Sequence, residues 1–277
     1  MLLQRHTNLG PALKISAFRK VAIGTWRTVG DPSVYGVLEI DVGNALNYIE
    51  RLSKKSGQRI TITHFIGLAL GKTYQKYPQL NCILSLGRLY PRKDVDVFFQ
   101  VASDAKGEDL SGTIIRKIDF KSLVEIAQEM DAKVKKIRDG TDTTYKKSKG
   151  MMAKMPGILV GPILTLLSFI NFTLNLWSPL LGSPRDSFGS MMITNIGPLD
   201  LEMAFAPIVP YSRVPALYAV GAIREKPVVE NGEIKIAKMM TVCGTFDHRL
   251  IDGMYASFMA REVRAIFKDP ESAFGAV

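Results

Sequence analysis

Cysteine is scarce in this chain of 277 residues, which contains only two of them. Cys82 and Cys243 lie in apolar stretches and lack the spacing of metal ligands, so we expect neither a disulfide framework nor a metal site. Their expected role is packing in the core, and a reducing compartment such as the cytoplasm suits them. Residues 1–10 lack the apolar run of a secretory signal, and no internal repeat is visible.

Acidic residues are fewer than basic ones, at 26 against 36, which gives a formal charge of +10. Such an excess suits nucleic acid, an anionic membrane or a phosphorylated cofactor. No nucleic-acid-binding motif is present, so no nucleic-acid partner is expected. Much of the excess lies between residues 133 and 154, where a solvated helix face is the simpler interpretation. The hydrophobic share of 47% is ample for a large core.

Histidine occurs three times, and one occurrence lies in a distinctive turn. A β-prone stretch over residues 238–246 leads into the polar turn 247–253, and a helical pattern begins at Met254. Histidine side chains titrate near neutral pH, so His248 at a strand end is well placed to act as a general base. A single histidine in a turn is by itself more often structural, and the spacing leaves both interpretations open.

Several segments resemble one family in the order in which the family has them. Residues 247–253, DHRLIDG, resemble the D-H-R-x-x-D-G signature of 2-oxoacid dehydrogenase acyltransferase catalytic domains, whose core is shared with chloramphenicol acetyltransferase. Residues 219–229, AVGAIREKPVV, and residues 239–242, MMTV, resemble the stretches that precede this signature. Residues 193–197, ITNIG, resemble the family's T-I-S-N-L-G strand.

The resemblance implies an α/β, chloramphenicol-acetyltransferase-like fold of two layers, in which helices cover a mixed sheet. We expect a mobile N-terminal arm over residues 1–15 and one acyltransferase domain over residues 16–277. The family forms trimers with active sites between subunits, so a homotrimer and larger particles are expected. The family's lipoyl and subunit-binding domains are not seen before residue 16, so lipoamide is expected from a separate carrier, with dehydrogenase-complex partners.

By the same resemblance, the chain is expected to transfer an acyl group between a thioester and a thiol, with coenzyme A as a substrate and no metal. His248 would be the general base, and Thr194, in place of the family's serine, would donate to the oxyanion. Asp252 would brace the turn by accepting hydrogen bonds within it or from an arginine, either Arg19 or Arg249. Gly253 would allow close backbone approach. The remaining residues expected to support the site are Asn195 and Asp247.

Two other functions stay open. One is a non-catalytic core that holds a multienzyme assembly together. The other is a free-standing acetyltransferase with a hydroxyl acceptor, like the antibiotic-modifying relative. A histidine at 248 together with a hydroxyl at 194 favours an enzyme, and the D-H-R form of the motif favours the dehydrogenase branch.

Periodicity predicts the remaining elements. Residues 67–73, GLALGKT, look like a phosphate-binding loop but have one residue too few between the glycines, so we predict a helix there and a structural role for His64. Asn-Gly at 231–232 predicts a hairpin over residues 228–236. Strands are predicted at residues 35–42, 94–102, 110–118, 188–196, 216–223 and 238–246, and helices at 16–24, 45–53, 61–77 and 121–139.

An apolar insertion over residues 145–187 departs from the family. Residues 155–184 contain no charged side chain. Pro162 and Pro179 are expected to bracket a helix over residues 163–178, which at about 24 Å is too short for the roughly 30 Å core of a bilayer. Intersubunit or partner packing is preferred to binding at a membrane surface. The predicted packing seam is Ile163, Leu166, Leu167, Ile170, Leu174 and Trp177.

Overall fold

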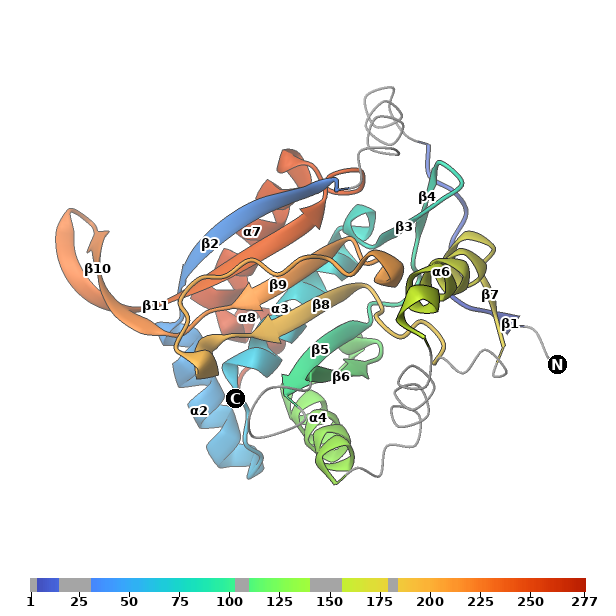
Figure 1. Cartoon of the computed structure of the whole chain (residues 1–277). Coiled ribbons are helices and arrows are strands. Elements are labelled where there is room, and N and C mark those ends of the chain that lie inside the picture. The colour runs from blue at the N-terminus through green and yellow to red at the C-terminus, as the bar shows by residue number, and fades with distance from the viewer. Residues whose placement is uncertain (1–3, 15–30, 103–109, 140–155, 179–183) are drawn as a thin grey trace.

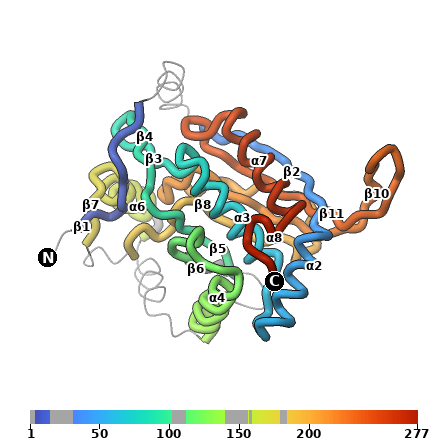
Figure 2. The backbone as a smooth tube through the Cα atoms, turned by 180° about the vertical axis from the view of Figure 1, so that it is seen from behind, coloured from blue at the N-terminus to red at the C-terminus, as the bar shows by residue number. Residues whose placement is uncertain are grey.

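The computed structural model describes residues 4–14, 31–102, 110–139, 156–178 and 184–277. Helices lie on one face of a twisted central sheet, as Figure 1 shows from the sheet side and Figure 2 from the helix side. The predicted two-layer α/β fold is therefore confirmed. The amphipathic helix predicted for residues 16–24, and with it Arg19, lies outside the described residues.

Seven described strands form this sheet, in the order β10-β11-β9-β8-β5-β6, with β2 paired to β11. β8 runs parallel to β5 and β9, whereas the other pairs are antiparallel, so the sheet is mixed. The strands are β2 (Ser33–Asp41), β5 (Val97–Ala102), β6 (Leu110–Ile115), β8 (Met191–Asn195), β9 (Ala216–Val220), β10 (Arg224–Glu230) and β11 (Glu233–Asp247).

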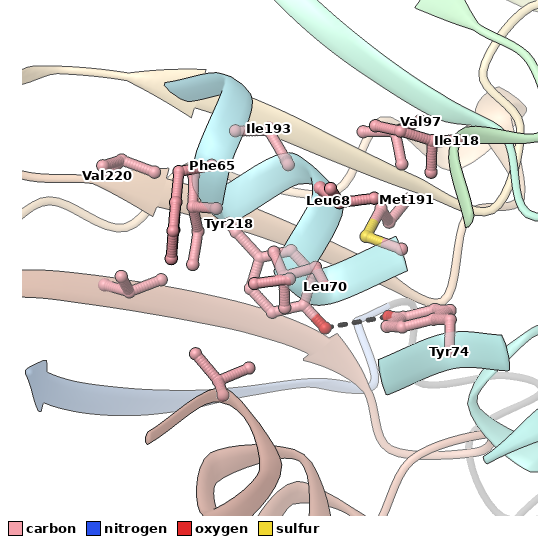
Figure 3. Close-up of a cluster of buried hydrophobic side chains, with 14 of the residues drawn as sticks. Phe65, Leu68, Leu70, Tyr74, Val97, Ile118, Met191, Ile193, Tyr218 and Val220 are labelled. Atoms are coloured by element: carbon pink, nitrogen blue, oxygen red, sulfur yellow. Dashed lines mark hydrogen bonds between the residues drawn. The ribbon is translucent and has the colours of Figure 1, made fainter. Parts of the chain in front are cut away.

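The core lies between the sheet and its helices, and α3 runs through the middle of it (Figure 3). Phe65 and Tyr74 of α3 are fully buried there together with Tyr218 of β9 and Phe267 of α7. The helices are α2 (Gly43–Ser56), α3 (Ile62–Lys76), α4 (Leu123–Arg138), α7 (Gly253–Lys268) and α8 (Pro270–Phe274). Turns of 3-10 helix cover Pro78–Leu80, Ile118–Phe120, Gly197–Leu199 and Pro210–Ser212.

The segment that looks like a phosphate-binding loop is part of α3, as predicted. A Cβ atom at Gly67 would lie 2.5 Å from the Phe99 ring, and one at Gly71 would lie 2.6 Å from Ile118. The glycines therefore let the helix approach the sheet closely. His64 is buried near the helix start, where its Nδ1 accepts the backbone N–H of Thr61, so its role is structural as expected.

The predicted hairpin is also present, with β10 and β11 joined by Asn231 and Gly232. Both residues have positive φ, at 54° and 84°, as a two-residue hairpin turn requires. Other strand ends differ from the prediction. β5 begins at Val97 because the backbone N–H of Asp96 binds the Ser190 hydroxyl instead of joining the ladder. β6 ends before Lys117, whose φ of 49° turns the chain away from the sheet.

Residues 4–14 of the N-terminal arm are held in place by hydrogen bonds, contrary to the prediction of a mobile arm. β1 (Gln4–Arg5) pairs with β7 (Leu176–Trp177) of the insertion. The side chain of Asn175 accepts the N–H of Thr7 at 2.7 Å and donates to its carbonyl at 3.0 Å. The arm then crosses the small sheet of β3 (Cys82–Ser85) and β4 (Arg88–Pro91), and the N–H of Leu13 donates to the carbonyl of Leu89.

The helix in the insertion is shorter than predicted and begins earlier. α6 spans Gly157–Ser168 and contains Pro162, and a π-helical segment, η3 (Phe169–Thr173), follows it. Pro162 lies inside the helix, at a position that would normally donate an N–H to the preceding turn. The chain leaves the helix at Asn175, whose φ of 52° directs it into β7. No helix in the described segments is long and apolar enough to cross a bilayer.

The side of the insertion that packs on this chain is not the whole predicted seam, because two seam residues lie on the outward side. Ser168, Asn171 and Phe172 face inward and are buried, whereas Leu166 and Leu174 are 56% and 47% exposed. The wider π turn shifts which side chains face the protein. The inward Ser168 is stabilised because its hydroxyl accepts a hydrogen bond from a neighbouring loop.

Candidate functional site

The turn that contains His248 is fixed by backbone hydrogen bonds on both sides. The N–H of Asp247 donates to the carbonyl of Pro215 at 2.9 Å, and that of His248 donates to the carbonyl of Pro32 at 3.0 Å. His248 Nδ1 lies 3.1 Å from the carbonyl oxygen of Ile251. Since a carbonyl only accepts, Nδ1 carries the proton in the neutral ring and Nε2 keeps its lone pair. His248 is half-buried, so a substrate can reach this ring.

Asp247 and Arg249 form an ion pair within the same turn. Arg249 Nε lies 2.9 Å from Asp247 Oδ1, and Nη2 lies 2.6 Å from Oδ2. The backbone N–H of Arg249 also donates to Oδ1 at 3.0 Å. The pair is shielded, and such a two-pronged contact restricts both side chains. It therefore holds the residues on either side of His248.

Asp252 begins α7 and acts as its N-cap. Its Oδ1 accepts the backbone N–H of Tyr255 at 3.1 Å, which is one of the two roles expected for it. Arg249 pairs with Asp247 instead, and Arg19 lies outside the described residues. Among the described residues, a Cβ added at Gly253 would meet no atom within 4 Å, so they provide no close backbone approach there.

Thr194 and Asn195 end β8 and point to opposite faces of the sheet. Asn195 faces the helices, where its Nδ2 donates to the Thr63 hydroxyl at 2.8 Å, and its Oδ1 accepts from Gly197 N–H. Thr194 alternates to the other face, which it shares with Met192. Thr194 is half-buried, and its hydroxyl has no hydrogen-bond partner in the part of the chain that the structure describes.

A single chain does not bring Thr194 and His248 together. Thr194 pairs with Ala219 of β9, which pairs with Cys243 of β11. His248 lies five residues beyond Cys243, about 17 Å along the strand, and β8 lies two strand spacings, about 10 Å, to the side. An oxyanion donor must lie about 3 Å from the reacting oxygen. One chain therefore supplies the two halves of the predicted site at different ends of its sheet.

Sequence reasoning missed Arg213, which lies beside the His248 turn. It follows the 3-10 turn Pro210–Ser212 and has a positive φ of 53°. Its Nε donates to Ser168 Oγ of the insertion at 3.0 Å. Burial is the main cause that lowers the pKa of Arg213, and Arg249 lowers it further, while Asp247 raises it. No spacing or motif in the sequence marks this arginine.

The described residues offer no group of three or more His, Cys, Asp or Glu side chains that could hold a metal ion. Both cysteines are buried and unbridged, in agreement with the packing role predicted for them.

Comparison with known proteins identifies relatives of this architecture. The family model described as 2-oxoacid dehydrogenases acyltransferase (catalytic domain) matches residues 13–151 and 185–275 and leaves the segment between them unmatched. The lipoamide acyltransferase component of the branched-chain alpha-keto acid dehydrogenase complex of Bacillus subtilis is 24% identical over 242 residues, which are 86% of this chain and 47% of that protein. The chain thus spans about half the length of the curated relatives it matches.

Two solved structures show the same fold. The cubic core of the pyruvate dehydrogenase multienzyme complex aligns with a TM-score of 0.65 at 19% identity, over 95% of this chain and 94% of that one. A chloramphenicol acetyltransferase aligns with a TM-score of 0.53 at 13% identity, over 93% of this chain and all of that one. Since the family model matches most of the sequence, this chain belongs to the 2-oxoacid dehydrogenase acyltransferase family, in its catalytic domain.

Proposed function

We propose that the protein is an acyltransferase that moves an acyl group between a thioester and a thiol. Coenzyme A is one thiol and a dihydrolipoyl group is the other. The observation that carries this proposal is the hydrogen bond between His248 Nδ1 and the carbonyl of Ile251, which places the proton of the neutral ring on Nδ1 and the basic lone pair on Nε2. Family membership and the reach of solvent to this ring support it.

The reaction needs one proton to move twice. His248 Nε2 takes the proton of the attacking thiol, and the sulfur forms a bond to the thioester carbonyl carbon. The carbonyl oxygen becomes an oxyanion. When this intermediate collapses, the bond to the departing sulfur breaks, and the protonated Nε2 returns the proton to that sulfur. The base is needed because a free thiol with a pKa near 8.5 is mostly protonated at pH 7.

Thr194 stabilises the oxyanion in this proposal, and it comes from a second copy of the chain. Its hydroxyl has no partner among the described residues, so it is available as a donor. The separation of about 17 Å along the strand excludes Thr194 and His248 of the same chain from one reacting group. A site completed by a neighbouring copy removes this conflict.

An exposed apolar surface supports contact between copies, and we propose a trimer by the family resemblance. Ile234 and Ile236 of the projecting β10–β11 hairpin are each 77% exposed (Figure 1). Apolar surface of this extent is typical of an interface. Further exposed apolar residues on the hairpin and on the sheet face opposite the helices are Tyr35, Val37, Met203, Phe205 and Val229.

Mixed assemblies test the shared site. Chains with His248→Ala and chains with Thr194→Val are each expected to be nearly inactive, since loss of a base lowers the rate about 10²–10⁴-fold and loss of an oxyanion donor about 10²–10³-fold. In trimers that contain both kinds of chain, one of the three sites should be active, because a site is intact only when its His248 and its Thr194 come from the chains that keep them.

The assay is acyl exchange between acetyl-coenzyme A and dihydrolipoamide, on assemblies purified through two different tags. Thr194→Ser serves as the control that keeps the hydroxyl. No recovery in mixed assemblies would place both groups in one chain and contradict the shared site. Full activity of His248→Ala alone would contradict the catalytic proposal itself.

We also propose that the outward face of the insertion contacts another copy of the chain rather than a membrane. Leu159, Leu166, Phe169 and Leu174 are exposed, and the stretch around them carries no charge that would select a charged surface. The face lies at the opposite end of the molecule from the β10–β11 hairpin, as both views show (Figures 1 and 2). It would therefore form a contact separate from the one that completes the active site.

A further inference from the structure

Arg213 lies beside the His248 turn and takes no part in the proposed reaction. It lies two residues before Pro215, whose carbonyl accepts the N–H of Asp247. Asp247 in turn precedes His248. The backbone of Arg213 is left-handed, with φ of 53° and ψ of 26°. Non-glycine residues seldom adopt this conformation, so the surrounding loop holds Arg213 in a defined place.

The guanidinium of Arg213 is anchored at only one of its nitrogens. Nε donates to Ser168 Oγ, and Ser168 is 6% exposed at the inner side of the insertion. In the segments that the structure describes, neither Nη group of Arg213 has a hydrogen-bond acceptor. The side chain is half-buried, so these donors are oriented by a shielded contact and remain reachable.

The charges around this guanidinium do not balance. Arg249 makes a two-pronged contact with Asp247, so the carboxylate of Asp247 is already neutralised by another cation. Arg213 places a second cation beside the same turn, where the charges of Arg249 and Asp247 both act on its guanidinium. A positive charge beside a thiol-activating histidine favours a negatively charged group on the substrate.

We propose that Arg213 binds an oxyanion group of the acyl donor or of the thiol acceptor, and that Ser168 of the insertion positions it. The two Nη groups match the two oxygens of a carboxylate or phosphate. The oxyanion is either the free carboxylate of a dicarboxylic acyl group or a phosphate of coenzyme A. This inference rests on the proposed function, and it gives the insertion a role in substrate selection.

Four substrate pairs distinguish the two sources. An acetyl thioester and a succinyl thioester are each presented on coenzyme A and on N-acetylcysteamine, which has no phosphate. In Arg213→Gln we expect KM to rise about 10- to 100-fold for the pairs that contain the recognised oxyanion, with kcat little changed, because a charge-assisted contact is lost. A rise only with succinyl donors identifies the carboxylate, and a rise only with coenzyme A identifies the phosphate.

Three further variants test the positioning. Ser168→Ala should raise KM a few-fold for the same substrate pairs only, because Nε loses one hydrogen bond. Arg213→Lys should recover part of the affinity, since it restores the charge without the fork. Arg51→Gln, which breaks an exposed ion pair with Glu271 far from the turn, is the matched control and should change nothing.

Binding without turnover separates this inference from the proposed function. Calorimetric titration with coenzyme A and with succinyl-N-acetylcysteamine should show a loss of affinity in Arg213→Gln for the one ligand that carries the recognised oxyanion, even if the wild type transfers no acyl group. Two results would overturn the role of Arg213 in oxyanion recognition. One is a KM in Arg213→Gln equal to that of the wild type for all four pairs. The other is an equal rise of KM for all four pairs, including acetyl-N-acetylcysteamine.

Discussion

The hydroxyl groups of Tyr74 and Tyr218 allow a stability prediction that depends on the direction of one hydrogen bond. Both side chains are 1% exposed, and their oxygens lie 2.8 Å apart (Figure 3). The hydroxyl of Tyr218 donates to Met259 Sδ at 2.9 Å. Because a hydroxyl has one hydrogen, Tyr74 must be the donor to Tyr218. The two Tyr→Phe substitutions are therefore not equivalent.

Tyr218→Phe removes the acceptor of Tyr74 and leaves a buried O–H unsatisfied, which should lower the free energy of unfolding by about 1–3 kcal/mol. Tyr74→Phe removes only a donor from an oxygen that still donates to Met259, so the expected loss is about 0.5–1.5 kcal/mol. The double variant leaves no orphaned hydroxyl. Its loss should therefore be smaller than the sum of the two single losses.

Urea unfolding of the four proteins at one protein concentration measures these differences, with a constant slope as the check on a common mechanism. pH gives a second test. Burial raises the pKa of both tyrosines above the ordinary value of 10. The stabilisation is thus complete below about pH 10 and is lost as pH rises further, and the double variant should lack this loss. Equal and additive effects of the single substitutions would refute the donor order.

Three other predictions concern the arm, the insertion and a helix cap. Burial lowers the pKa of His6 from 6.5 to about 4. The stabilisation of the arm by neutral His6 should therefore be intact above pH 6.5 and fall by about 3 kcal/mol as the pH approaches 4. Hydrogen exchange at the Thr7 amide should report this fall, and His6→Gln should abolish the pH dependence. Leu166→Glu should reduce particle size in light scattering without loss of trimers, whereas loss of liposome binding alone would favour a membrane contact. Ser122→Ala should lower the thermal midpoint by the equivalent of about 1 kcal/mol, because Ser122 Oγ caps α4 by accepting from Glu125 N–H; an unchanged midpoint would contradict this.

The elements that the sequence predicts correctly are those with a local physical signal. A two-residue hairpin turn requires positive φ at both positions, and few residue pairs other than Asn-Gly tolerate it. The pair Asn231-Gly232 is therefore enough to predict the hairpin. The strand that leads to His248 and the helix that follows it show clear periods. The roles proposed for Thr194 and His248 follow from the family resemblance, since spacing alone favours a structural histidine.

The parts that the sequence does not predict depend on distant contacts. Ser168 is a polar residue in an apolar helix, so the sequence predicts that it faces solvent. It is buried instead, because Arg213, 45 residues away in the sequence, donates a hydrogen bond to it. Pro162 predicts a helix boundary, but it lies inside α6, which begins at Gly157. The sequence predicts a mobile N-terminal arm because the residue that holds it, Asn175, lies far along the chain.

The distance between Thr194 and His248 in one chain and the outward-facing insertion favour two separate contacts between copies. A single chain separates Thr194 from His248 along the sheet, and it leaves Leu166 and Leu174 exposed at the end of the molecule opposite the hairpin. One interface cannot cover both regions, because a contact through the hairpin and the sheet leaves the insertion uncovered. We therefore infer that trimer formation completes the active sites, and that the insertion joins trimers or larger units in a second step. The two steps should separate by mutation, because a charge at Leu166 affects only the second.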